Sequence, residues 1–107
     1  MAERVLRDER IYPGDVARFS ISVLDPDDRT TAVDPVALVV KVLEPGATTA
    51  TTYTYGTDAE IVRSDTGEYY IDIELDDDGD WFVRMESTTP TDAAEYYILV
   101  LPSVFPA

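Results

Sequence analysis

Alternation of apolar and polar residues with a period of two is the feature of this chain that most restricts its fold. In the segment 15–25, Phe19, Ile21 and Val23 fall on one face, and arginine and serine side chains fall on the other. The same alternation recurs in residues 68–75 and 80–87. Successive side chains of a β-strand point to opposite faces, so such segments offer one face to a core and one to water. No segment shows a sustained helical period, and the pattern indicates a sheet protein.

Turn residues divide the alternating pattern into short pieces. The seven prolines stand at turns or near the ends of the chain, where a sheet tolerates them. At 107 residues, the chain has the length of one domain, residues 1–107, and we expect a short N-terminal arm (1–11) and a C-terminal tail (102–107). The sequence therefore predicts an all-β, immunoglobulin-like antiparallel β-sandwich of about seven strands. The expected strands are 15–25, 35–46, 48–56, 60–67, 68–75, 80–87 and 93–102.

Composition excludes several classes of function. The chain has 22 acidic and 8 basic residues, a net charge of −14, and such a field repels nucleic acid. It contains no Cys and no His, so the usual nucleophile–base pairs and soft-metal sites are absent, and we expect neither an enzyme nor a cofactor. No apolar run suits a signal peptide or approaches the roughly 20 residues of a membrane span. We expect synthesis in the cytoplasm, without an export signal.

The stretch IELDDDGDWFVRM, residues 73–85, concentrates carboxylates around Gly79. Asp76, Asp78 and Asp80 match the first three alternate ligands of an EF-hand calcium loop. Gly79 then stands at position 4 instead of 6, and Ser87 replaces the bidentate glutamate at position 12. The spacing therefore excludes an EF-hand.

A tight turn explains this stretch better. Asp78-Gly79 is a strong hairpin signal between two alternating segments, and we predict that it joins them as a β-hairpin. Trp81 is expected in the core, in phase with Val83 and Met85. A cation site of another type at Asp76, Asp78 and Asp80, helped by Asp25, Asp27 and Asp28 if the two loops meet, remains the alternative.

One sheet face is expected to carry uncovered apolar side chains. The third, sixth and seventh strands of an immunoglobulin-type sandwich share a sheet, and we assign residues 37–43, 80–86 and 93–101 to those places. If Lys41, Arg84 and Glu95 face water, the apolar residues in phase with them do so too, and a patch of this kind usually marks an interface. The alternative is that the N-terminal segment or the tail with Phe105 folds over it. The predicted interface residues are Val39, Leu43, Phe82, Tyr97 and Leu99.

The segment 48–56 is rich in threonine and tyrosine and is polar enough for a sheet edge. An edge strand with Tyr53 and Tyr55 suits the addition of a strand from a neighbour. Tyrosine-rich surfaces also suit stacking on sugars. This segment therefore supports an alternative function, a carbohydrate-binding or adhesion module of a surface protein.

Three motifs carry a family resemblance. YPGD leading into an alternating strand, an EPG turn, and TGEYYIDIELDDDGDWFVRM resemble the small immunoglobulin-like proteins encoded among the structural genes of tailed viruses. They are also similar to macroglobulin-type and bacterial surface modules. The resemblance covers roughly residues 11–87. It implies roles such as capsid decoration or a neck or tail accessory.

A virion protein is made in the cytoplasm and needs no export signal, anchor or linker, and none is evident in this sequence. We therefore expect a non-enzymatic structural protein of the virion. It would be held in many copies by other virion proteins, with no contact to nucleic acid or membrane.

Overall fold

The computed structural model describes residues 10–105, which form seven β-strands and no helix. The predicted arm (1–11) lies outside the described residues except for residues 10 and 11, and so do the last two residues of the predicted tail (102–107). The all-β sandwich predicted from the alternation is confirmed. The strands are β1 (Asp15–Ser22), β2 (Ala37–Leu43), β3 (Thr51–Thr54), β4 (Ile61–Asp65), β5 (Glu68–Leu75), β6 (Gly79–Thr88) and β7 (Asp92–Val100).

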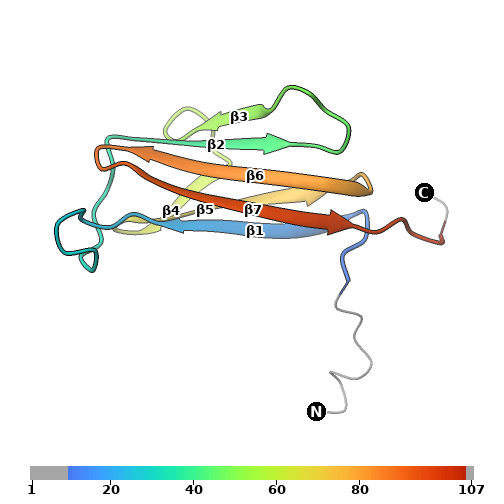
Figure 1. Cartoon of the computed structure of the whole chain (residues 1–107), viewed down its shortest axis with the longest axis horizontal. Helices are drawn as coiled ribbons and strands as arrows, with labels where there is room; N and C mark the ends of the chain where they lie inside the picture. Colours follow the sequence, from blue (N-terminus) through green and yellow to red (C-terminus); the bar gives the residue numbers. More distant parts are fainter. Residues whose placement is uncertain (1–9, 106–107) are drawn as a thin grey trace, which may run out of the picture.

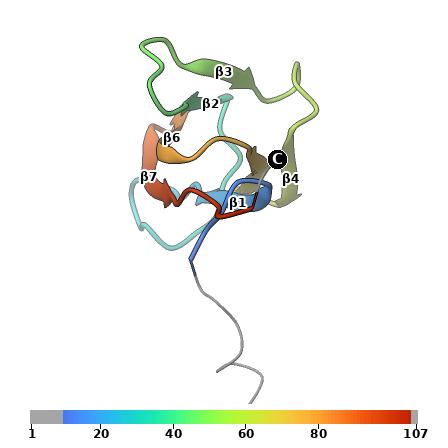
Figure 2. The same ribbon diagram turned by 90° about the vertical axis from the view of Figure 1, so that its right-hand side faces the viewer.

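Two antiparallel sheets pack face to face (Figures 1 and 2). One contains three strands in the order β1-β5-β4, and the other contains four in the order β3-β2-β6-β7. The three segments assigned to one sheet, now β2, β6 and β7, do share it. The threonine- and tyrosine-rich strand β3 stands at an edge, as predicted. The connections β1–β2, β3–β4 and β5–β6 all pass from one sheet to the other.

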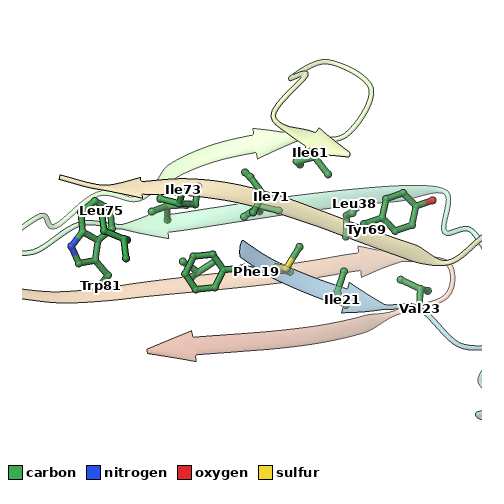
Figure 3. Packing of buried hydrophobic residues seen from close by; sticks show 14 of the residues in the cluster. Phe19, Ile21, Val23, Leu38, Ile61, Tyr69, Ile71, Ile73, Leu75 and Trp81 are labelled. Carbon is green, nitrogen blue, oxygen red and sulfur yellow. The ribbon is translucent and has the colours of Figure 1, made fainter. Parts of the chain in front are cut away.

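The core lies between the sheets and follows the period-two pattern. In β5, Tyr69, Ile71 and Leu75 are buried, while the intervening Asp72 and Glu74 are exposed. Trp81 is 2% exposed, which confirms its predicted place in the core. Figure 3 shows Trp81 and Leu75 at one end of the cluster and Tyr69 at the other. The inward apolar side chains of β1, β2, β5 and β6 are thus buried between the two sheets.

The predicted hairpin at Asp78-Gly79 is wrong, because β5 and β6 belong to different sheets. Both edges of β6 are occupied, one by β2 and the other by β7, so β5 has no edge of β6 to pair with. Residues 76–78 instead carry the chain across the sandwich. Gly79 has φ 122°, and a Cβ there would lie 2.8 Å from Cβ of Pro45. The Trp81 indole Nε1 donates to the Asp77 carbonyl at 2.9 Å, which ties the crossing to the core.

A second connection is fixed at the opposite end of the sandwich. The Asp34 carboxylate accepts hydrogen bonds from Arg63 Nε at 3.0 Å, the Gly67 N–H at 2.9 Å and the Tyr69 hydroxyl at 2.8 Å. The Arg63 guanidinium, with the other two donors, holds the pKa of Asp34 well below its usual range. Burial, and then the bond to Asp34, raises the pKa of Tyr69 to about 12. This carboxylate joins the β1–β2 connection to the β4–β5 turn.

Candidate functional site

The outer face, meaning the solvent side of the sheet β3-β2-β6-β7, is built by the alternation of β6. Val83 and Met85 point into the core, whereas Phe82 and Arg84 point outward. Residues opposite one another in an antiparallel pair share a face. The register therefore places Leu43, Phe82 and Tyr97 in one row across three strands, with Leu99 beside them on β7. We call these four residues the apolar patch.

The apolar patch is open to solvent. Phe82 is 47% exposed, Tyr97 57% and Leu99 48%, while Leu43 is half-buried. The rings of Phe82 and Tyr97 pack together, with centroids 5.3 Å apart and planes at 37°. Four of the five residues predicted for the interface thus lie together at one end of the outer face.

A hydrogen bond positions the largest side chain of the patch. The Tyr97 hydroxyl donates to Asp80 Oδ1 at 2.7 Å, across the β6–β7 pair. This bond to a carboxylate, followed by partial burial, raises the pKa of Tyr97. The bond holds the Tyr97 ring on the side of Phe82. Sequence reasoning missed this role of Asp80, because the spacing of the acidic residues suggests only a metal ligand at that position.

Charged side chains border the patch on the same face. Glu86 accepts from Lys41 at 2.9 Å and from Arg84 at 2.6 Å, and Arg84 also pairs with Glu95 at 2.6 Å. Hydrogen bonds from Lys41 and Arg84 lower the pKa of Glu86. The charges of these four side chains cancel, and Asp80 adds one further carboxylate at the patch. The fifth predicted interface residue, Val39, is half-buried beside Glu86, away from the apolar patch.

A shallow depression of about 210 Å³ lies between the patch and the charged border. Leu43, Ala50 and Phe82 line it, with Lys41 and Arg84 at its side. Its lining is mainly apolar and thus suits an apolar side chain more than an ion.

The C-terminal tail does not cover this face. Phe105 is 79% exposed and lies near Tyr12 and Pro102, and on another side near Pro13 and Gly14. These residues stand where β1 begins, at the same end of the sandwich as the patch but beside the three-stranded sheet. The alternative in which Phe105 folds back over the patch is therefore not what the described tail does. The alternative that placed the N-terminal segment there concerns residues outside those described.

Tyr53 and Tyr55 do not form the predicted sugar-stacking surface, whereas the edge position of β3, on which addition of a neighbour's strand depends, is as predicted. Tyr53 is opposite the buried Val40 and packs against the core. Tyr55 follows the end of β3, and its ring meets that of Tyr69 edge-on at 5.1 Å. Tyr55 remains 40% exposed. The sequence did not predict that Tyr53 points inward, because a strand in which threonine and tyrosine alternate has no clearly apolar face.

The carboxylates predicted as a cation site are not assembled as proposed. Within residues 10–105, the group whose carboxylate oxygens lie within 4.8 Å of one another is Glu44, Asp76 and Asp77, all exposed. Asp78 is not part of it, and Asp80 bonds Tyr97 on the outer face.

The helper aspartates Asp25, Asp27 and Asp28 are remote from this group. They follow β1, whereas Asp76 follows β5, and the antiparallel register of β1 and β5 puts these two points at opposite ends of the sandwich. Exposed carboxylates at such spacing are common in acidic proteins, and this group supports no metal site.

No protein-family model, curated protein or solved structure matches this chain. Residues 10–105 contain no helix of the length and apolarity that a membrane crossing requires. The functional proposal therefore rests on the sandwich and its outer face.

Proposed function

We propose that this chain is a non-enzymatic structural protein of a tailed-virus particle. It would act as a capsid decoration, neck or tail accessory, and its outer face would contact other virion proteins. The observation that carries the proposal is the apolar patch, in which Phe82, Tyr97 and Leu99 are each about half exposed on a rigid sheet. Monomeric proteins rarely leave such side chains side by side in water unless a partner covers them.

The composition of the face suits a protein partner. Aromatic side chains are enriched at the centres of protein interfaces, and a polar rim surrounds them. Here Phe82 and Tyr97 form the centre, and the pairs made by Lys41, Arg84 and their carboxylates form one border. Fully burying a large apolar side chain contributes about 1.5–3 kcal/mol, so each half-exposed residue has roughly half of that left to gain.

The strand pairing beneath the patch also favours association. β6 is paired on both edges, and the Tyr97–Asp80 bond holds the ring in place. A preorganised surface loses little conformational freedom when it binds. The resemblance to immunoglobulin-like virion proteins supports the class of partner, and the patch supports the place of contact.

The test compares two variants, each of which introduces one negative charge on a different outer face. Phe82→Asp places a carboxylate in the patch, and Val16→Asp is the matched control, because Val16 is 65% exposed on the outer face of the three-stranded sheet. Both variants should fold, as measured by circular dichroism and thermal unfolding. We expect Phe82→Asp to be lost from particles assembled in host cells and Val16→Asp to be retained. Normal incorporation of a folded Phe82→Asp chain would refute the proposed contact.

A carbohydrate-binding role has no specific support in the geometry, because Tyr53 faces the core and Tyr55 packs on Tyr69. A glycan-array signal that Tyr55→Ala abolishes would nevertheless replace the virion proposal with this alternative.

A further inference from the structure

The C-terminal tail, residues 101–105 (LPSVF), carries a second uncovered apolar surface. Val104 is 91% exposed and Phe105 79%. The tail runs beyond the ends of the two sheets in Figure 1. These two adjacent side chains therefore leave apolar area that a contact would bury.

The root of the tail directs it away from its own outer face. The Leu101 N–H donates to the Ile11 carbonyl at 2.9 Å, and Ile11 pairs in parallel with Val100. Beyond this point, Phe105 lies near Pro13 and Gly14, at the end of the sandwich where β1 begins. The tail of one copy therefore does not cover the patch of the same copy, and it projects where a second copy can bind it.

The depression beside Phe82 has the size of one aromatic ring. Its volume is about 210 Å³, and an apolar cavity of roughly 150 Å³ accommodates benzene. Phe105 supplies the phenyl ring that such a site would take.

Charge favours the tail of a second copy, and not the outer face of a second copy, as the partner of the depression. Residues 101–105 contain no ionisable side chain, and the charges beside the depression balance: Lys41 and Arg84 against Glu86 and Glu95. A symmetric face-to-face pair would enclose the Asp80 carboxylates of both copies in a broad contact, whereas docking of the tail involves the patch of one copy only. The tail adds no charge of its own to the contact, although Glu74, Asp76 and Asp78 lie beside Phe105.

We propose that Phe105 and Val104 of one copy dock in the depression beside Phe82 of a second copy. The inference rests on the proposed function, in which the outer face is a protein contact, and it names one occupant of that face. The two surfaces differ, so the contact is head-to-tail and repeats from copy to copy. A multi-copy assembly can thus be extended with a single type of contact.

The contact is small beside the roughly 1,200–2,000 Å² of a stable interface. Free chains should therefore associate weakly, and copies held side by side should associate strongly through the raised effective concentration. The experiment accordingly uses concentrations up to the solubility limit.

Two complementary variants test the direction of the contact. Phe105→Asp disables the docking side chain of the tail and leaves the patch intact. Phe82→Asp disables the patch and leaves the tail intact, and Val16→Asp is the control. We expect sedimentation to show concentration-dependent association of the wild type and of Val16→Asp, and monomers for each patch or tail variant alone. An equimolar mixture of Phe105→Asp and Phe82→Asp should form dimers and nothing larger, because only one productive contact is left.

Other results would overturn the inference. A symmetric face contact leaves Phe105→Asp associating like the wild type and gives no dimer-limited mixture. A wild type that stays monomeric at every concentration also contradicts it, and if Phe82→Asp is still lost from particles, the proposed function stands without the tail. Conversely, both variants could abolish association while Phe82→Asp is still incorporated normally into particles. That result would support the tail contact and refute the virion role of the face.

Discussion

The outer faces of the two sheets treat their aromatic side chains in opposite ways. On the three-stranded sheet, the Arg18 guanidinium lies 3.8 Å from the centroid of the Tyr70 ring and is held there by Asp72 at 2.8 Å. On the four-stranded sheet, the rings of Phe82 and Tyr97 pack against each other and remain about half exposed. The chain itself covers the Tyr70 ring on one face, and the rings on the other face are left for a partner to cover.

The contrast does not arise from a shortage of cations on the second face. Lys41 and Arg84 both lie there, yet their charges are engaged by Glu86 and Glu95 instead of covering the rings. An aromatic ring capped by its own chain is satisfied in the monomer. Uncapped rings beside internally paired charges form a surface with apolar area still to bury, which is why we place the contact there.

The largest expected effect separates the two sides of β6. Met85 is fully buried, so Met85→Ala should lower the free energy of unfolding by about 2–5 kcal/mol. Phe82→Ala, on the outward side, should cost about 1 kcal/mol or less, because it removes mainly one cross-strand pair. Urea unfolding measures both values. Equal losses would mean that the patch is part of the folding core and not a contact surface.

A smaller loss of stability is expected at the Asp34 corner, where the Asp34 carboxylate accepts hydrogen bonds from Arg63, Gly67 and Tyr69. Tyr69→Phe keeps the buried ring and removes the hydroxyl that donates to Asp34 at 2.8 Å. The free energy of unfolding should fall by about 1–2 kcal/mol, since the acceptor is a charged but partly solvated carboxylate. Incorporation into particles should not change. A defect in assembly without loss of stability would assign this corner a role in contact that we do not expect.

Part of the pH dependence of stability should come from this corner, since the fold also lowers the pKa of Asp28, Asp72 and Glu86. Because Arg63 and its neighbours lower the pKa of Asp34 in the folded state, the stabilisation is present above the unfolded pKa of about 3.9 and is lost as pH falls toward the lower folded pKa. Thermal unfolding midpoints should therefore drop below about pH 4. Asp34→Asn should reduce this drop, and Asp78→Asn, in the exposed crossing, should leave it intact. The same slope in both variants would exclude Asp34 as one of its sources.

The smallest expected effect on stability concerns the Tyr70 ring, which the Arg18 guanidinium covers. A double-mutant cycle with Arg18→Ala and Tyr70→Ala should give a small favourable coupling, because both groups are partly solvated. Thermal unfolding of the four proteins provides it. Zero coupling would show that Arg18 only lies near the ring, and the contrast between the two faces would weaken.

The alternation of residues made much of this arrangement predictable. A period of two fixes the face of every side chain in a strand once one is known, so Trp81 could be placed inside and Phe82 outside. The same phase placed Tyr97 and Leu99 on the outer face. These assignments depend only on neighbouring residues, which the sequence displays directly.

Pairing between strands was less predictable, because it depends on the whole sheet. Asp78-Gly79 is a local hairpin signal, but β2 and β7 already occupy both edges of β6. Gly79 is needed for its positive φ and for the close approach of Pro45, and neither requirement is specific to a hairpin. A local signal cannot report which edges distant strands have taken.

Contacts between loops were not predictable at all. Asp34 meets Arg63, Gly67 and Tyr69 across separations of 29, 33 and 35 residues. No periodic pattern links such positions. The group of Glu44 with Asp76 and Asp77 likewise joins two loops that are far apart in the sequence.

The most direct test of the central claim measures solvent access to both outer faces in the free and assembled chain. Hydroxyl-radical footprinting reports side-chain oxidation at Phe82, Tyr97 and Leu99 and, on the other face, at Val16 and Tyr70. We expect the first group to become protected on assembly and the second to react equally in both states. Unchanged oxidation of Phe82 and Tyr97 in the assembled state would contradict the claim that this face is the contact surface.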